Sequence, residues 1–187
     1  GRFDVLFQGQ LQGTVSWSLS GEHNRWNAFA AIAAARHTGV PPSQAIASLA
    51  NFENVKRRME TRGVVNGVTV IDDFAHHPTA IATTVAGLRH KVGKARILAV
   101  LEPRSNTMKL GTMKDALPDS LKAADLVFGY GARGEGKDAL GWDLSAALSP
   151  LGNKAQAFDD LSALVAAVGA AAKPGDFVLR SEEHTSE

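Results

Sequence analysis

The densest group of side chains that could do chemistry lies between Asp72 and Pro78. Asp72 and Asp73 end an apolar run, two histidines follow, and Pro78 suits the first turn of a helix. Carboxylates at a strand end can accept hydrogen bonds from ribose hydroxyls or orient a cation. His76 or His77 could be a base, a metal ligand or a donor near a phosphate. The alternatives are a capping carboxylate with solvated histidines, or a divalent-metal site, for which further acidic ligands are not evident.

A second polar segment, Glu102–Thr107, also follows an apolar run. Arg104 carries a planar guanidinium, which suits two parallel hydrogen bonds to a carboxylate. Ser105, Asn106 and the threonine after them add hydrogen-bond donors. The alternative is an ordinary loop that caps the following helix.

The segment Gly21–Asn27 opens a long predicted helix and carries Asn24 and Asn27, three residues apart on one face. An asparagine amide offers both a donor and an acceptor, which matches the edge of an adenine. N-capping of the helix is the alternative, and it accounts for one asparagine but not for both.

Two basic segments are weaker candidates. Lys56–Glu60 lies where the composition changes; it could supply a cation to a polyphosphate, but a solvated basic linker is the default interpretation. Gly131–Lys137 is glycine-rich, yet its lysine is followed by Asp138 instead of the Ser or Thr of a phosphate-binding loop. We therefore interpret it as a surface loop.

Short apolar strands alternate with helices from residue 60 to residue 179. The hairpin Val64–Val70 has Asn66 and Gly67 at its tip, a pair suited to a type I′ turn. Further strands are predicted at 97–101, 126–130, 155–158 and 177–179, and further helices after Pro78, over 110–121 with a break at Pro118, and over 161–172. The alternation predicts an α/β domain with a largely parallel sheet, whose ligands bind beyond the carboxyl ends of the strands.

The first 55 residues have a different pattern. Residues 1–20 read as two strands joined by a turn near Gly9, and because a lone hairpin is marginal in water we expect them to belong to a larger sheet. A helix is predicted over 23–37, with Trp26 and Phe29 on its apolar face, and a second helix starts at two consecutive prolines.

Composition narrows the function. Lys and Arg total 20 and Asp and Glu total 19, for a formal charge of +1, so charge gives no argument for nucleic acid or an acidic membrane surface. The chain is 44% hydrophobic and has no cysteine, which excludes disulfide scaffolds, thiolate metal sites and thiol catalysis. We expect neither a membrane span nor a signal peptide.

Three of these segments match one family in order and spacing. Gly21–Asn27 fits the pattern Gly-x-His-Asn-x-x-Asn, Arg58-Met59-Glu60 fits Arg-(aromatic or Met)-Glu, and Asp73–Pro78 fits Asp-aromatic-(Ala or Gly)-His-x-Pro. Over residues 12–179 the sequence thus resembles the Mur ligases, the ATP-dependent enzymes that build bacterial cell-wall peptides.

The resemblance implies a three-domain parent. Residues 1–55 would be the end of the central ATP-binding domain, 56–179 the Rossmann-like C-terminal domain, and 180–187, which are polar and lack an apolar face, a non-native tail. The family's phosphate loop and magnesium ligands would lie upstream, so we expect a fragment that is inactive alone.

The resemblance also implies roles for individual residues. Arg58 would contact the phosphates, Asp73 the ribose side, and His76, the candidate catalytic residue, would lie near the nucleotide or the acyl phosphate. The adenine would contact His23, Asn24 and Asn27, and the acceptor peptide would contact Arg104, Ser105 and Asn106. ATP and Mg²⁺ are the implied cofactors, with no metal ligand in this segment.

The segment Glu102–Lys109 resembles the branch that joins UDP-N-acetylmuramate to the tripeptide L-alanyl-γ-D-glutamyl-meso-diaminopimelate. The partners would then be small molecules in the cytoplasm, with neither nucleic acid nor membrane. The alternatives are the branch that adds L-alanine, a non-catalytic nucleotide-binding module, and a metal-dependent hydrolase using the histidines and aspartates of Asp72–His77.

Overall fold

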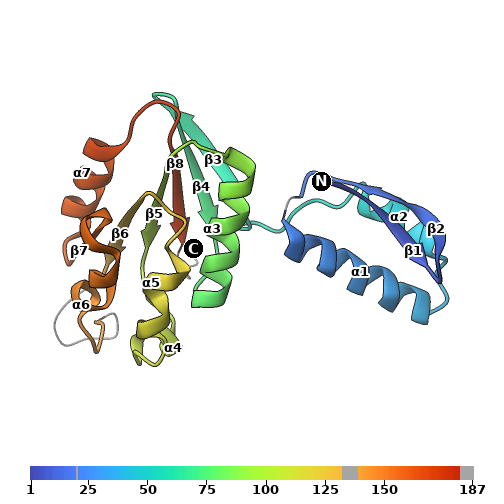
Figure 1. Cartoon of the computed structure of the whole chain (residues 1–187), viewed down its shortest axis with the longest axis horizontal. Helices are drawn as coiled ribbons and strands as arrows, with labels where there is room; N and C mark the ends of the chain where they lie inside the picture. The colour runs from blue at the N-terminus through green and yellow to red at the C-terminus, as the bar shows by residue number, and fades with distance from the viewer. Residues whose placement is uncertain (20, 132–138, 182–187) are drawn as a thin grey trace. The chain divides into compact units, whose positions relative to one another are not determined.

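A computed structural model of the chain describes residues 1–19, 21–131 and 139–181. The chain divides into two compact units, Gly1–Val55 and a larger one that starts at Lys56. Each unit has its own hydrophobic core, and Figure 1 shows that each has its own strands and helices. No helix among the described residues is both long and apolar enough to cross a membrane.

The smaller unit packs two helices on one antiparallel pair of strands. Its core is formed by Val5 and Val15 from the strands and by Ile32 and Ile46 from the helices. Its elements are β1 (Arg2–Phe7), β2 (Gln10–Ser16), α1 (Glu22–His37) and α2 (Pro42–Leu49). Within the described residues the two strands form a sheet of their own instead of joining a larger one, because α1 and α2 bury the apolar face that a hairpin cannot bury alone.

The apolar face of α1 differs in part from the expected one: Phe29 packs against the core of the smaller unit, but Trp26 does not. Trp26 is 65% exposed, whereas Ala28 and Ile32 are buried. Ile32 packs with Val5 and Val15 of the strands, while the Trp26 ring contacts Phe29 edge-on within the helix.

The larger unit is built on a six-stranded sheet in the order β3-β4-β8-β5-β6-β7. β3 runs antiparallel to β4, and all the other neighbours are parallel. The strands are β3 (Glu60–Val65), β4 (Val68–Asp73), β5 (Ile97–Leu101), β6 (Leu126–Tyr130), β7 (Ala155–Phe158) and β8 (Phe177–Ser181). The predicted α/β fold with a largely parallel sheet is confirmed.

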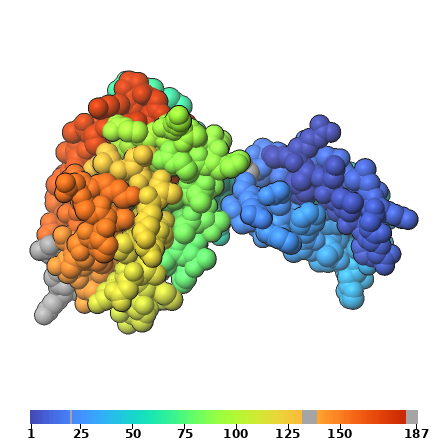
Figure 2. Space-filling view, viewed as in Figure 1, coloured from blue at the N-terminus to red at the C-terminus, as the bar shows by residue number. Residues whose placement is uncertain are grey.

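Helices cover both faces of this sheet. Four helices lie on one face, α3 (Pro78–Val92), α4 (Asn106–Lys109), α5 (Leu117–Ser120) and α6 (Leu144–Leu148), and their side chains hide that face in Figure 2. α7 (Leu161–Ala171) packs on the other face, over β6 and β7. Since α7 leads the chain back to β8 between β4 and β5, the strand order reverses here.

The structure confirms the predicted hairpin turn but changes the predicted helix over 110–121 and the predicted end of the last strand. Asn66 and Gly67 both have positive φ, 51° and 76°, as a type I′ turn requires. The helix expected over 110–121 is instead a 3₁₀ turn, Lys114–Ala116, followed by α5, and Pro118 lies in the first turn of α5, where its missing N–H is not needed. β8 runs two residues beyond its expected end at Leu179 because it pairs with both β4 and β5 as far as Ser181.

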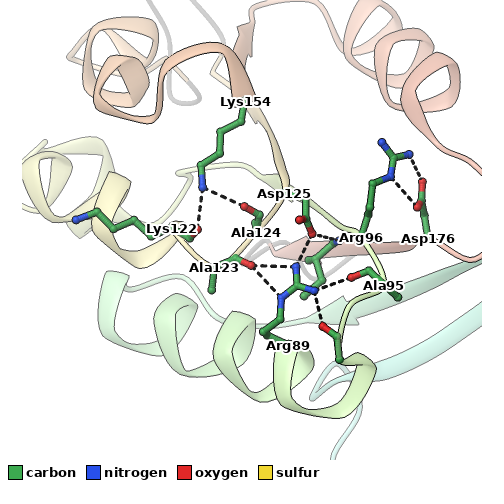
Figure 3. Close-up of polar contacts among 11 residues, drawn as sticks. Arg89, Ala95, Arg96, Lys122, Ala123, Ala124, Asp125, Lys154 and Asp176 are labelled. Atoms are coloured by element: carbon green, nitrogen blue, oxygen red, sulfur yellow. Dashed lines mark hydrogen bonds and ion pairs between the residues drawn. The ribbon is translucent and has the colours of Figure 1, made fainter.

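Charged side chains tie the loops together at the amino ends of the strands (Figure 3). The Arg89 guanidinium, at the end of α3, donates to the Asp125 carboxylate and to the carbonyl oxygens of Gly93, Ala95 and Ala123. Asp125 also accepts from the Ile97 N–H at 2.7 Å. Nearby, the Lys154 ammonium donates to two carbonyl oxygens of the loop before β6. At the amino ends of the strands, these hydrogen bonds and ion pairs thus hold the connecting loops in place.

The most buried of these pairs joins Arg96 to Asp176. Arg96 precedes β5 and donates to both carboxylate oxygens of Asp176, at 3.0 and 2.5 Å. The Lys173 N–H donates to the same carboxylate at 2.7 Å. These bonds, chiefly those from Arg96, hold the pKa of Asp176 below its ordinary value although burial acts in the opposite direction.

We predict that Asp176→Asn lowers the free energy of unfolding by about 1–2 kcal/mol at pH 7. Hydrogen bonds to charged groups contribute roughly 1.5–3 kcal/mol, and solvent screens part of this because the Arg96 side chain is 35% exposed. The lowered pKa means that the carboxylate stabilises the fold fully above its unfolded pKa, and that this stabilisation is lost as the pH falls through the folded pKa.

Urea denaturation at pH 7 and at about pH 3 checks this, because the gap between wild type and variant should narrow at the lower pH, below the roughly 3.9 of an unfolded Asp. Asp119→Asn is the matched control, since the ion pair of Asp119 with Lys122 is about 70% exposed on both sides and should matter little. A gap of equal size at both pH values would contradict the assignment.

Candidate functional site

Two of the candidate segments leave the sheet at the same edge. β4 ends at Asp73 and β5 ends at Leu101, and in the register both residues pair with Ser181 of the strand between them. The strand ends are therefore two strand spacings apart, or roughly 10 Å. Asp73–Pro78 and Glu102–Lys109 thus start beside each other, as expected for a site at the carboxyl ends of parallel strands.

Asp72 and Asp73 lie on opposite faces of the sheet. Because side chains alternate along a strand, Asp72 shares its face with Val70, whose partner Val178 belongs to the α7 side, while Asp73 lies on the α3 side. The Asp72 carboxylate is 3.4 Å from Arg57 Nε. Among the residues that the structure describes, no three His, Asp or Glu side chains cluster in a way that could hold a metal ion.

Asp73 is 2% exposed, although it is the last residue of its strand. One carboxylate oxygen accepts from the Met59 N–H at 2.8 Å. The other accepts from the Ala75 N–H at 2.9 Å and from the Thr84 hydroxyl at 3.1 Å. Asp73 is buried because protein donors replace the water that would otherwise solvate its charge.

The two histidines are held in different tautomers. His76 Nδ1 lies 3.0 Å from the Phe74 carbonyl oxygen, which can only accept, so Nδ1 carries a proton, and in the neutral ring the lone pair is then on Nε2. His77 precedes α3, and its Nδ1 accepts from the Thr79 N–H at 3.2 Å, so there Nδ1 carries the lone pair. His77 is thus the cap of α3, while His76 presents an acceptor nitrogen.

Phe74 fills the aromatic position of the family pattern, but the sequence assigned it no role. Its ring lies 5.3 Å from the guanidinium of Arg57 and 5.9 Å from that of Arg58, within the range of cation–π attraction. The ring also meets His76 edge-on at 5.2 Å. The run Lys56–Glu60 is therefore more than a solvated linker, since the Phe74 N–H also donates to the Arg57 carbonyl at 2.7 Å.

The segment after β5 has three different environments for its candidate residues. Arg104 is half-buried, and its Nη1 lies 3.5 Å from a carboxylate oxygen of Glu102. Ser105 is buried and caps α4 by accepting from the Met108 N–H at 3.2 Å, as expected of an ordinary helix-capping loop. Asn106 is exposed. The Trp142 indole N–H donates to the Met108 carbonyl at 2.8 Å and braces this turn.

The remaining candidates lie in the smaller unit, at the start of α1. Gly21 has φ 93°, and a Cβ there would come within 2.8 Å of the His23 ring, so only glycine fits. The N-cap position is Gly21, and Asn24 and Asn27 lie inside the helix, so neither asparagine is the N-cap residue. His23 and Asn27 are exposed and Asn24 is half-buried.

A small cavity of about 70 Å³ lies beyond the ends of β6 and β7, beside Trp142 and Asp143. It is lined by other residues than those of the Asp73–Pro78 segment. The glycine-rich segment Gly131–Lys137 lies, apart from Gly131, outside the described residues.

Comparisons with known proteins agree on one family. The family model described as "Mur ligase, glutamate ligase domain" matches residues 57–181. The UDP-N-acetylmuramate–L-alanyl-γ-D-glutamyl-meso-2,6-diaminoheptandioate ligase of Escherichia coli K12 is 49% identical over 95% of this chain. The UDP-N-acetylmuramate–L-alanine ligase of Roseiflexus castenholzii is 36% identical over 91% of it.

Solved structures show the same relationship. The crystal structure of a murein peptide ligase from Psychrobacter arcticus matches 97% of this chain with a TM-score of 0.73 at 38% identity. The chain spans about 38% of the length of the Escherichia coli and Psychrobacter relatives. With the matched segment 57–181 covering most of the larger unit, the chain belongs to the Mur ligase family.

Proposed function

We propose that this chain is part of an ATP-dependent ligase that joins UDP-N-acetylmuramate to L-alanyl-γ-D-glutamyl-meso-diaminopimelate. The observation that carries the proposal is the pair of segments, Asp73–Pro78 and Glu102–Lys109, that leave the sheet at one edge from neighbouring strand ends. The higher identity to a tripeptide ligase, 49% against 36% for an L-alanine ligase, favours the tripeptide as the acceptor.

In the proposed reaction ATP phosphorylates the muramate carboxylate, and the L-alanyl amine of the tripeptide attacks the acyl phosphate and expels phosphate. Phosphoryl transfer of this kind needs positioned charges more than protein nucleophiles. Arg58 supplies a cation for the phosphates, and Asp73 lies on the ribose side. His23, Asn24 and Asn27 bind the adenine.

His76 is proposed to act on the attacking amine. Its Nδ1–H is bonded to the Phe74 carbonyl, so in the neutral ring the lone pair is on Nε2. Nε2 can therefore take the proton that the ammonium of the tripeptide must lose before it attacks. Mg²⁺ belongs to the proposal through the family, but Asp72 and Asp73 on opposite faces do not fit it, so we assign it no residue and no step in this chain.

Arg104 is proposed to bind a carboxylate of the tripeptide, with Ser105 and Asn106 beside it. Its side chain is 29% exposed and lies against Glu102, which limits the directions it can take. Free L-alanine has one carboxylate and no distal group for such a clamp, so this residue separates a tripeptide ligase from an L-alanine ligase.

A metal-dependent hydrolase and a non-catalytic nucleotide-binding module have less support. The hydrolase would need Asp72 and Asp73 to converge, and they face opposite sides of the sheet. The binding module would not need an arginine and an acceptor nitrogen at the same edge, beside the strand ends where substrates of α/β enzymes react.

We predict that Arg104→Lys in the full-length ligase raises the KM for tripeptide while the KM for ATP stays nearly constant, because lysine keeps the charge but loses the two-pronged geometry. Arg104→Ala should have a larger effect, by roughly 2–5 kcal/mol if the ion pair with substrate is buried. Initial rates with each substrate varied in turn measure this. A collapse of ATP affinity would make Arg104 a nucleotide ligand, and unchanged constants would make the loop structural.

We also predict that the 187-residue chain alone has no ligase activity, since its sequence has no Gly-rich loop ending in Gly-Lys-Ser or Gly-Lys-Thr. Phosphate release and product formation should match a blank without protein, while the full-length enzyme is active under the same conditions. Any ligation by the chain that His76→Ala abolishes would show that the chain itself carries the reaction, contrary to our division of the site.

A further inference from the structure

A strained turn follows directly after the boundary between the two units. Arg57 and Met59 have φ of 59° and 53°, in the left-handed region that residues other than Gly, Asn and Asp rarely adopt. Such conformations are costly and persist where the surroundings fix them. The turn connects Val55, the last residue of the smaller unit, to β3.

Three hydrogen bonds fix this turn. The Met59 N–H donates to Asp73 at 2.8 Å, the Phe74 N–H donates to the Arg57 carbonyl at 2.7 Å, and the Arg57 N–H donates to the Glu60 carboxylate at 2.9 Å. Of the acceptors, only Asp73 is buried. The other oxygen of Asp73 accepts from the Ala75 N–H and from the hydroxyl of Thr84, a residue of α3. One carboxylate therefore connects the turn to α3.

The conformation of the turn decides where the neighbouring guanidiniums lie. Arg58 is placed between the two strained residues, and its guanidinium lies 5.9 Å from the Phe74 ring. Phe74 follows Asp73 directly, so the residue that holds the turn and the ring that the arginine meets are adjacent in the chain. A change in the Met59–Asp73 bond should therefore move Arg58 more than it moves the sheet.

We infer that Asp73 is a positioning residue whose carboxylate keeps the turn Arg57–Met59 closed and thereby fixes Arg58 over Phe74. This replaces the direct nucleotide contact that the family pattern implies for Asp73, because the residue is 2% exposed and both of its carboxylate oxygens already accept from protein donors. It rests on the proposed function only for what Arg58 contacts; the closure of the turn does not depend on it.

Limited trypsin digestion of the 187-residue chain tests the closure. In Asp73→Asn the side chain keeps its size, but one oxygen becomes an NH₂ donor that faces the Met59 N–H or the donors Ala75 N–H and Thr84 hydroxyl. Cleavage after Arg57 and Arg58 should rise by at least about tenfold, since cleavage follows the population of the open turn. Cleavage after the exposed Lys94 is the internal standard.

Thr84→Val is the matched control, because it removes a hydrogen bond to Asp73 but leaves the Met59 bond in place. Its cleavage after Arg57 and Arg58 should stay at the wild-type rate. Wild-type cleavage of Asp73→Asn, or equal sensitivity of both variants, would overturn the inference. If Asp73→Asn does not fold, hydrogen exchange of the Met59 amide in the wild-type chain decides: an unprotected amide overturns the inference and a protected one supports it.

A double-mutant cycle in the full-length ligase tests whether Asp73 acts through Arg58. If it does, Asp73→Asn combined with Arg58→Ala should lose little more kcat/KM for ATP than Arg58→Ala alone. Losses that multiply would mean that Asp73 acts independently of Arg58, which overturns the positioning role. If Arg58→Ala leaves turnover unchanged, the proposed phosphate contact fails, whereas the trypsin result still decides whether Asp73 closes the turn.

Discussion

The buried carboxylate of Asp73 is the point on which the candidate site of the larger unit depends. It ends β4, accepts from the backbone of the turn before β3, and accepts again from the start of the loop and from the side chain of α3. A negative charge in such a place is tolerated because several donors compensate for its lost hydration. The same bonds fix the direction of Phe74 and of the following loop to His76.

The amino ends of the strands carry contacts that stabilise the fold, whereas the carboxyl ends carry the candidate site residues. At the amino ends of the strands, Arg89, Arg96 and Lys154 bind carbonyl and carboxylate groups of the loops, which closes the loops against the sheet. At the carboxyl ends, polar side chains follow β4 and β5, and the insertion of β8 between these strands sets their spacing. Rigid support at one edge leaves the other free to carry residues selected for binding.

Features of the fold that depend only on neighbouring residues could be predicted from the sequence. The Asn66-Gly67 turn, the short apolar strands and the helix cap after β5, which is Ser105, all depend on neighbouring residues. The placement of Asp72 and Asp73 on opposite faces also follows from the two-residue period of a strand, once the strand is continued through both residues.

Other features depend on contacts between distant parts of the chain. The position of β8 between β4 and β5 pairs residues about a hundred positions apart, and no periodicity encodes strand order. The burial of Asp73 depends on the backbone N–H of Met59, which has no side-chain signature, and the role of Phe74 depends on arginines that reach it from that turn. The predicted face of α1 was wrong at Trp26 for the same reason, since the strands and not the largest side chain decide which side is buried, whereas Phe29 on the same predicted face does pack against the core.

If the carboxyl edge of this sheet serves a ligase whose acceptor is a tripeptide, the choice of acceptor should be visible in the rate. The most direct measurement is ADP release by the full-length enzyme with UDP-N-acetylmuramate and ATP, comparing L-alanyl-γ-D-glutamyl-meso-diaminopimelate with L-alanine as the acceptor. We expect kcat/KM for the tripeptide to exceed that for L-alanine by at least about tenfold, since a second bound carboxylate contributes a charge-assisted pair. A preference for L-alanine, or ADP release that no acceptor stimulates, would contradict the proposed function.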